Sequence, residues 1–498
     1  MPVASTTPLR SVRALPGPGP LVEHVPGGGG TYWARLLPLL AALACVTRLP
    51  SFRGPLWSPD EGYLAVQARI LAHGGELYET VVDRKPPLVP WLYEGSFALF
   101  GDSSLLPLKV LAVTAQLLTA ALLASLARRR WGDGAGRTAG VVHLLISIGL
   151  NPQDAQAATF EIFMLPCTAA AMWCADRRRW GAAGVAVACA LLAKQTGGAV
   201  LLPVAWLLWR EGAPRPSVAR LAAGLCAPLL AAAALTTPSG LVFWTVTGSG
   251  AYASFTGSEL HVLGRGLVNT LLLAGVCAGI VPAVVRVLRV ARTGAPELWL
   301  WLASSAAAVL LGFHFFGHYY LQLMPPLALL GTAALQILPR ERTVRAIVAT
   351  GCSCAVFLAW GFLAPRPDLA HAKRLAEVIG SHAAGPEDKV LVWGIHPETY
   401  WLADRAPASR YLTAGLLTNY SGGRNGPQVG EKYAVEGTWP VFREELRRHP
   451  PKLVVDDSRG KPYGPDRVPS LRRILTEGYR PVLRVEGAVV YARAGRGR

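Results

Sequence analysis

The sequence predicts a mainly α-helical membrane protein, with a polytopic helix bundle and a small C-terminal α/β domain. Hydrophobic residues make up 52% of the 498 positions, and only 16% are charged. Soluble chains carry about 25% charged residues, so lipid is the expected solvent for much of this chain. Basic residues gather between long apolar runs. We divide the chain into a tail (1–31), a transmembrane module (32–363) and an extracytoplasmic domain (364–498).

The first 31 residues are rich in proline and glycine and include the run Gly27-Gly28-Gly29-Gly30. Such a composition is typical of a disordered segment, because it contains too little apolar surface to form a core. No apolar stretch follows the initiator methionine closely enough for a signal peptide. We therefore expect a disordered cytoplasmic tail.

The transmembrane module contains about eleven apolar segments, three of them shorter than the roughly 20 residues that a bilayer core requires. The candidate spans are 33–50, 105–127, 136–151, 159–175, 181–194, 197–209, 217–236, 266–285, 297–313, 321–338 and 344–363.

The loops between these spans alternate in charge. Five alternate short loops hold sixteen arginines, whereas the four loops between them hold only Lys194 and Arg265. Positively charged loops stay in the cytoplasm, which predicts a cytoplasmic N-terminus and an outside C-terminal domain. This distribution also explains the net charge of +18 without nucleic acid as a partner. The arginines are Arg128, Arg129, Arg130, Arg137, Arg177, Arg178, Arg179, Arg210, Arg215, Arg220, Arg286, Arg289, Arg292, Arg340, Arg342 and Arg345.

Two segments on the predicted outer side are long. The loop 51–104 contains two short helical patterns, Asp60 to His73 and Pro86 to Phe100, both rich in apolar and aromatic residues. Their composition predicts interfacial helices. The C-terminal domain alternates short apolar strands, at 389–394, 452–456 and 488–491, with helical patterns, which favours a small mixed sheet.

All eight cysteines fall inside apolar runs, where small buried side chains are the better interpretation than disulfides or zinc ligands. The spans contain almost no ionisable groups, which argues against a proton-coupled transporter and towards chemistry at the outer interface.

The adjacent acids Asp60 and Glu61, just past the first span, suit a general base or a divalent cation. Arg84 and Lys85 suit a phosphate. The alternative is that Asp60 and Glu61 only place negative charge at a helix N-terminus.

Several short motifs occur in one order along residues 33 to 340, and their combination resembles a known family. The matching positions are Asp60-Glu61, Tyr63, Ala65, Gly74, Tyr78, Lys85-Pro86-Pro87, the segment Thr159 to Pro166 around Glu161, Lys194-Gln195-Thr196-Gly197, and Phe316-Gly317-His318-Tyr319-Tyr320 with the apolar residues that follow. This pattern resembles bacterial glycosyltransferases of the C superfamily (GT-C, families 39 and 83). These are the relatives of protein O-mannosyltransferases and of the lipid A aminoarabinose transferase.

The resemblance implies a role for each matching residue. Asp60 matches the catalytic base or acceptor-orienting acid, and Glu61 is its partner. Glu161 matches a second acidic position, for which Asp154 is a rival. Lys85, with Arg84 beside it, matches the basic position near the donor phosphate.

Four further positions match residues that line the lipid-donor cavity: Lys194, Gln195, His318 and Tyr319. Each position also has a simpler explanation. Lys194 could extend its ammonium group to the interface from the end of a span. His318 and the tyrosines could belong to an aromatic belt, and Glu161 could be a helix N-terminal charge.

Together these features predict an inverting hexosyl- or pentosyltransferase of the cytoplasmic membrane, with a polyprenyl-phosphate sugar as donor. The sequence has no nucleotide-binding glycine loop, which suits a lipid-linked donor. The acceptor could be a protein, a lipid or a polysaccharide, and a divalent cation held by Asp60 and Glu61 stays open. The alternatives are a ligase for lipid-linked glycans, and a transporter or scaffold of envelope assembly. A transporter would be expected to show paired halves, and the sequence has no convincing internal repeat.

Overall fold

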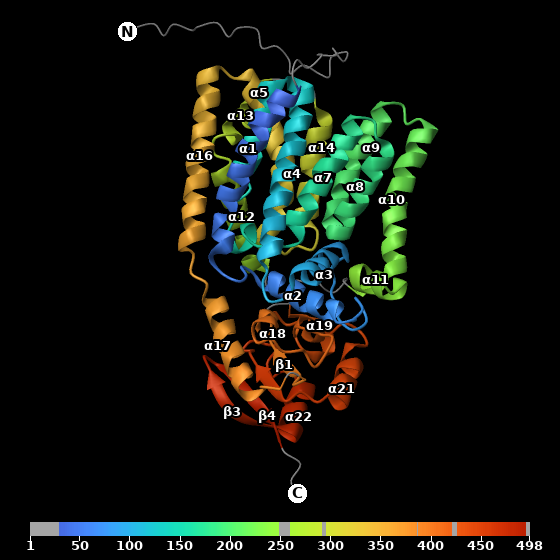
Figure 1. Ribbon diagram of the computed structural model, residues 1–498, viewed down its shortest axis with the longest axis vertical. Helices are drawn as coiled ribbons and strands as arrows, with labels where there is room; N and C mark the ends of the chain where they lie inside the picture. The colour runs from blue at the N-terminus through green and yellow to red at the C-terminus, as the bar shows by residue number, and fades with distance from the viewer. Residues whose placement is uncertain (1–28, 249–258, 291–294, 386, 421–425, 495–498) are drawn as a thin grey trace.

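The protein forms a helical bundle with a small sheet-containing domain at one end (Figure 1). The computed structural model describes residues 29–248, 259–290, 295–385, 387–420 and 426–494. Most of the predicted tail, residues 1–28, lies outside the described residues, and the first helix begins at Gly29. The predicted fold class, a mainly α-helical bundle with a small C-terminal sheet, is confirmed.

The bundle consists of long apolar helices. Five helical stretches of the described chain are long and apolar enough to cross a membrane: Gly30–Arg53, Leu106–Trp131, Arg215–Leu235, Gly317–Ile337 and Arg340–His382. Two shorter helices are also apolar, and the chain is a multi-pass membrane protein. The bundle helices are α1 (Gly29–Arg48), α4 (Leu106–Trp131), α5 (Asp133–Ile146), α7 (Phe160–Asp176), α8 (Trp180–Ala193), α9 (Leu201–Arg210), α10 (Arg215–Leu235), α12 (Glu259–Val276), α13 (Val281–Val290), α14 (Pro296–Leu310), α15 (Met324–Ile337) and α16 (Arg340–Leu363).

The apolar segment 266–285, predicted as one span, is divided between α12 and α13. A Cβ added at Gly279, in the connecting turn, would lie 2.0 Å from the carbonyl oxygen of Ala346. The backbone of the turn therefore packs directly against α16. Pro282, which cannot donate a backbone hydrogen bond, stands at the start of α13. The division follows from this close approach and this proline.

An ion-pair network connects four helices at the end of the bundle far from the C-terminal domain. Arg130, at the end of α4, contacts Asp176 of α7 at 2.8 Å and Glu297 of α14 at 2.5 Å. Arg210 of α9 contacts the same Glu297 at 3.5 Å. Because Glu297 is buried, its two arginine partners compensate for the cost of burying its charge.

Short helices lie between the bundle and the C-terminal domain (Figure 1). The loop after α1 forms a 3₁₀ turn, η1 (Leu49–Arg53), followed by α2 (Pro59–Ala72) and α3 (Leu88–Phe100). Both helices lie within about two residues of their predicted bounds. The helix α11 (Pro238–Thr245) lies beside them, at the foot of α10.

The C-terminal domain has a four-stranded sheet in the order β1-β2-β4-β3. Strands β1 (Val390–Trp393) and β2 (Leu453–Asp456) are parallel, and β4 (Ala488–Arg493) is antiparallel to β2 and to β3 (Tyr479–Val485). The sequence predicted β1, β2 and β4 but missed β3. The helices of the domain are α17 (Pro367–His382), α18 (Glu398–Leu402), α19 (Gly415–Thr418), α21 (Thr438–Arg448) and α22 (Pro469–Gly478).

Candidate active site

Asp60 lies in the first turn of α2, at the end of the bundle that faces the C-terminal domain. Ser58 caps the helix by accepting a hydrogen bond from the Glu61 backbone N–H at 3.4 Å. The cap and Pro59 at the first helical position explain why α2 starts here. Asp60 is partly buried, and its charge acts on Asp83 and Lys194. Its carboxylate therefore lies within electrostatic range of Lys194.

Glu61 has a different environment from its neighbour. Its side chain is fully buried, and its carboxylate accepts hydrogen bonds from the backbone N–H groups of Trp57, Ser58 and Ala158. The bond to Ala158 measures 2.8 Å and connects α2 with the segment before α7. A carboxylate that accepts hydrogen bonds from three backbone N–H groups fixes the backbone around it, which favours a structural role for Glu61.

Arg48, which the sequence analysis did not single out, holds the same segment from the other side. Its guanidinium is buried at the end of α1 and donates to the carbonyl groups of Ala155, Gln156 and Ala157. Arg48 and Glu61 together fix the backbone between α6 (Pro152–Ala155) and α7. This segment carries Asp154 at one end and leads to Glu161 at the other.

Glu161 and Lys194 form a buried ion pair between the start of α7 and the end of α8. The Lys194 ammonium also lies 3.9 Å from the centroid of the Tyr319 ring, a cation–π contact. Tyr319 is more than a hundred positions from Glu161 and Lys194 in sequence, yet the fold brings all three together. The Lys194 ammonium is thus held between the Glu161 carboxylate and the Tyr319 ring.

His318 extends this cluster from the 3₁₀ turn η4 (Gly317–Leu323). Its Nδ1 lies 2.7 Å from Oδ1 of Asp154, and its backbone N–H donates to the same oxygen at 3.0 Å. Its Nε2 lies 4.0 Å from Oε1 of Glu161. Asp154 and Glu161 therefore both contact His318, so the two rival acidic positions occupy one site. Gly317 permits this approach, because a Cβ there would lie 2.3 Å from Oδ2 of Asp154.

The loop that carries Lys85 is held by hydrogen bonds to its backbone. The Tyr78 hydroxyl donates to the Lys85 carbonyl at 2.8 Å, and the Gln195 amide donates to the Arg84 carbonyl at 2.6 Å. The Lys85 ammonium lies 5.6 Å from the centroid of the Phe160 ring. Its charge acts on both Glu161 and Lys194. Gln195 therefore supports the loop through its backbone.

Asp83, two residues before Lys85, was not among the predicted site residues. The pKa of its carboxyl is raised to about 6, chiefly by burial; the Lys85 ammonium lowers it and the nearby Asp60 raises it. A carboxyl whose pKa approaches neutrality beside a cationic group is typical of functional sites. The signal available in the sequence was its place in the run Asp83-Arg84-Lys85.

The predicted pairing of Asp60 with Glu61 as cation ligands does not fit this geometry. The two Glu61 oxygens are engaged by backbone amides, which leaves Asp60 as a single donor. Within the described ranges, no group of three or more histidine, cysteine, aspartate or glutamate side chains is arranged to hold a metal ion.

The C-terminal domain packs directly on the loop that carries the site. A Cβ added at Gly62 would lie 2.4 Å from the Cβ of Glu398, the first residue of α18. The backbone N–H of Val82 donates to the Arg410 carbonyl at 3.4 Å. Arg69 of α2 also forms a 3.1 Å ion pair with Asp404.

The chain is similar to known glycosyltransferases in part of its sequence and in its fold. The family profile of dolichyl-phosphate-mannose-protein mannosyltransferases matches residues 84–239. No curated protein sequence matches the chain.

Solved structures are similar over nearly the whole chain. ArnT from Cupriavidus metallidurans bound to undecaprenyl phosphate is 16% identical with a TM-score of 0.61, and the match covers 94% of this chain and 99% of ArnT. The structure of the same ArnT in the apo state is 17% identical with a TM-score of 0.62, and the match covers 93% of this chain and 98% of ArnT.

The archaeal oligosaccharyltransferase AglB from Archaeoglobus fulgidus, in complex with an inhibitory peptide and a dolichol-phosphate, is 12% identical with a TM-score of 0.52. That match covers 93% of this chain and 74% of AglB. The chain therefore has the GT-C fold, and the resemblance to GT-C glycosyltransferases predicted from its sequence is confirmed.

Proposed function

We propose that this protein transfers a sugar, with inversion, from a polyprenyl-phosphate donor to an acceptor hydroxyl at the outer face of the cytoplasmic membrane. One observation carries the proposal: three basic side chains, Lys85, Lys194 and His318, gather around the buried Glu161 at one end of an apolar bundle. Asp60 is near enough for its charge to act on Lys194. Such a site offers cationic contacts to a phosphate and a carboxylate to a hydroxyl.

The reaction needs no more than these groups in a single displacement. The acceptor oxygen attacks the anomeric carbon while the bond from that carbon to the phosphate oxygen breaks, and the phosphate leaves with the electron pair. Asp60 takes the proton of the acceptor hydroxyl. Lys85, Lys194 and His318 stabilise the negative charge that develops on the leaving phosphate. Attack from the face opposite the phosphate inverts the anomeric centre.

The two acids Glu161 and Asp154 act as positioning groups in this mechanism. Each contacts a basic side chain. Glu161 is 1% exposed and paired with Lys194, and Asp154 is partly exposed but engaged by His318. Buried cations keep their charge when a carboxylate compensates them. We therefore assign proton transfer to Asp60 and the orientation of Lys194 and His318 to the other two acids.

The comparisons support the donor class. The ArnT structure contains undecaprenyl phosphate, the AglB structure contains a dolichol-phosphate, and the matching family uses dolichyl-phosphate mannose by its description. All three lipids are polyprenyl phosphates. This agreement favours a phosphate-linked lipid as the donor here, and the sugar that it carries is a matter for direct assay.

The test is a donor assay with the purified, full-length protein in proteoliposomes. A panel of radiolabelled polyprenyl-phosphate hexoses and pentoses is incubated with envelope extract as the acceptor source, and free polyprenyl phosphate is measured. We expect one donor to be consumed, with its label in the extract and polyprenyl phosphate released in equal amounts. Consumption of none of the donors by folded protein would contradict the proposal. Release of polyprenyl pyrophosphate from a lipid-linked glycan would favour the ligase alternative.

A further inference from the structure

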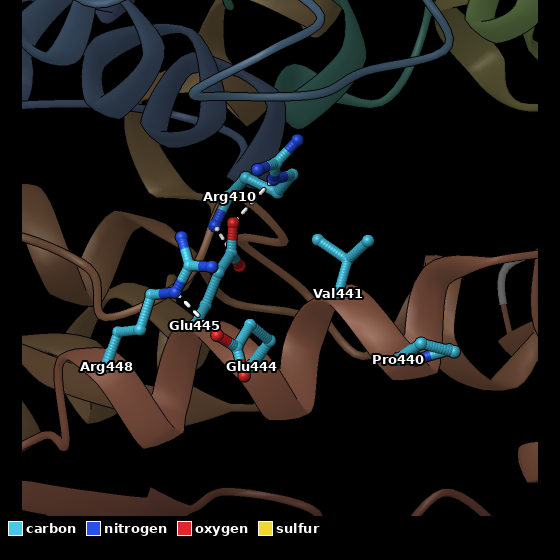
Figure 2. A pocket seen from close by; sticks show the side chains of 6 residues that line it. All are labelled: Arg410, Pro440, Val441, Glu444, Glu445 and Arg448. Carbon is cyan, nitrogen blue, oxygen red and sulfur yellow. Dashed lines mark hydrogen bonds and ion pairs between the residues drawn. The ribbon is translucent and has the colours of Figure 1, made fainter.

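A pocket of about 400 Å³ lies on the C-terminal domain, against α21 (Figure 2). Its volume falls in the range of about 300–1,000 Å³ that is usual for small-molecule sites. Four charged and two apolar side chains line it: Arg410, Pro440, Val441, Glu444, Glu445 and Arg448. None of these residues belongs to the site described above.

The pocket lies within the C-terminal domain, and Arg410 is the lining residue that connects it to the loop carrying the site. Figure 2 shows Arg410 on the side of the pocket nearest to the blue ribbon of the N-terminal part of the chain. The Arg410 carbonyl accepts the hydrogen bond from Val82, which directly precedes Asp83. The next residue, Tyr411, contacts the ring of Trp244 in α11 at 6.4 Å between centroids. A molecule in this pocket would therefore lie next to the proposed catalytic loop.

The charges of the pocket compensate one another. Arg410 donates through Nε to Oε1 of Glu445 at 2.5 Å, and its backbone N–H donates to Oε2 at 3.2 Å. Arg448 donates through Nε to Glu444 at 2.6 Å. The pocket thus has two positive and two negative groups, each paired with an opposite one. Because each charge that lines the pocket already has a counter-charge, an ionic ligand would gain little electrostatic attraction there.

We propose that the pocket is a subsite for a neutral saccharide, which forms the non-reacting part of the acceptor. Sugar hydroxyls both donate and accept, so they can use the remaining guanidinium N–H groups and carboxylate lone pairs without disturbing either ion pair. Pro440 and Val441 offer an apolar surface to the C–H face of a sugar ring. The acceptor role rests on the proposed function, whereas saccharide binding itself does not.

Binding is tested on the full-length protein in lipid nanodiscs by saturation-transfer NMR and calorimetry. The probes are three neutral trisaccharides (maltotriose, mannotriose and arabinotriose), an acidic one (trigalacturonate) and a cationic one (a glucosamine trimer). We expect at least one neutral probe to bind. Val441→Trp should abolish binding by filling the pocket, and Arg448→Ala should weaken it about tenfold or more.

Arg447→Ala is the matched control. Arg447 contacts the same Glu444, at 2.8 Å, but does not line the pocket, so its removal should leave affinity unchanged. The proposal is overturned if only the charged probes bind, if none binds, or if Arg448→Ala and Arg447→Ala have equal effects. The comparison of Arg448→Ala with Arg447→Ala remains valid even if the Val441→Trp variant fails to fold.

The acceptor role has its own measurement. A saturating amount of the neutral probe that binds should accelerate the release of polyprenyl phosphate from the donor in wild-type protein but not in Arg448→Ala at the same concentration. Binding without acceleration, in protein that still transfers sugar to extract, would show that the pocket is not an acceptor subsite. Loss of all donor use in wild-type protein would instead contradict the proposed function and leave the binding result intact.

Discussion

At the scale of single residues, two basic side chains of the site are each held by an acid. Lys194 pairs with Glu161, and His318 contacts Asp154. A buried charge without its partner costs several kcal/mol, so either acid is expected to matter for folding as well as for activity. Lys85 is different, because the residue is only partly buried and its loop is held by hydrogen bonds to the backbone. Lys85 is therefore the basic residue whose function can be tested without unfolding the site.

Lys85→Ala should weaken binding of a polyprenyl-phosphate donor by roughly 10- to 150-fold, since a charge-assisted contact is worth about 1.5–3 kcal/mol. Lys85→Arg keeps the charge and should retain most of the affinity. Donor affinity is measured by titrating polyprenyl phosphate into purified protein. Equal affinity in the alanine variant and the wild type would remove Lys85 from the donor site.

The raised pKa of the Asp83 carboxyl should make the stability of the protein depend on pH. Its pKa is 3.8 in the unfolded chain and about 6 in the folded protein. Between these values the folded state binds more protons than the unfolded state, so this carboxyl lowers stability as pH rises from about 4 to 6. Asp83→Asn should remove that contribution and raise the melting temperature at pH 7 more than at pH 4. A shift of the same size at both pH values would contradict the environment described for Asp83.

At the scale of secondary-structure elements, the position of Asp60 depends on the packing of α2 against α18. Besides the Glu398 Cβ, a Cβ at Gly62 would lie 2.6 Å from the Glu398 Cα and 2.9 Å from its backbone nitrogen. Backbone atoms cannot move aside as a flexible side chain can. Any larger residue at position 62 must therefore displace α2, and Asp60 lies two residues away on the same helix.

Gly62→Ala should reduce turnover on the order of 10- to 100-fold, because small displacements of reacting groups have effects of that size. Donor affinity should change much less, since Lys85 and Lys194 lie outside α2. Gly95→Ala in α3 is the control: no atom lies within 4 Å of the added Cβ, and alanine is the better helix former by about 1 kcal/mol. If Gly62→Ala turns over at the wild-type rate, the contact with α18 does not position Asp60.

Elements with a strong local pattern could be predicted from the sequence, and elements set by long-range contacts could not. The Ser58-Pro59 cap predicts the start of α2 to within a residue. Strand β3 was missed because five of its seven residues are exposed and Pro481 interrupts it, so it lacks the alternation of a half-buried strand. Proline is tolerated there because β3 is an edge strand.

The same distinction applies to the site. Asp60 and Lys85 stand in one loop, where adjacent acids and bases can be recognised together. The contacts of His318 with Asp154 and of Arg48 with Gln156 join residues 164 and 108 positions apart. Nothing local in the sequence indicates either contact. The sequence alone also could not separate Asp60, whose charge acts on Lys194, from Glu61, whose carboxylate accepts hydrogen bonds from the backbone.

At the scale of the whole molecule, the site and the arginine-rich loops occupy opposite ends of the bundle. Arg130 and Arg210 meet Glu297 at one end, whereas Asp60 and Lys85 lie at the other end, beside the C-terminal domain. Positively charged loops stay in the cytoplasm, so we propose that the C-terminal domain and the site face outward. Such an orientation allows an acceptor to approach from the outside while the donor lipid arrives within the membrane.

Labelling of introduced cysteines in intact cells with a membrane-impermeant maleimide tests this orientation. Glu477→Cys, on the exposed face of α22, should be labelled from outside. Arg178→Cys, in the loop between α7 and α8, should be labelled only after the membrane is opened. The reverse pattern would place the C-terminal domain in the cytoplasm.

The central claim is that Asp60 takes the acceptor proton while its basic neighbours hold the donor phosphate. Asp60→Asn keeps the size of the side chain and removes its charge. General-base catalysis contributes about 10²- to 10⁴-fold, so the rate of polyprenyl phosphate release under donor saturation should fall by that factor, with donor affinity largely retained. A helix N-terminal charge alone would instead contribute at most about 1 kcal/mol to stability. Turnover by purified, folded Asp60→Asn protein at near the wild-type rate would contradict the proposed mechanism.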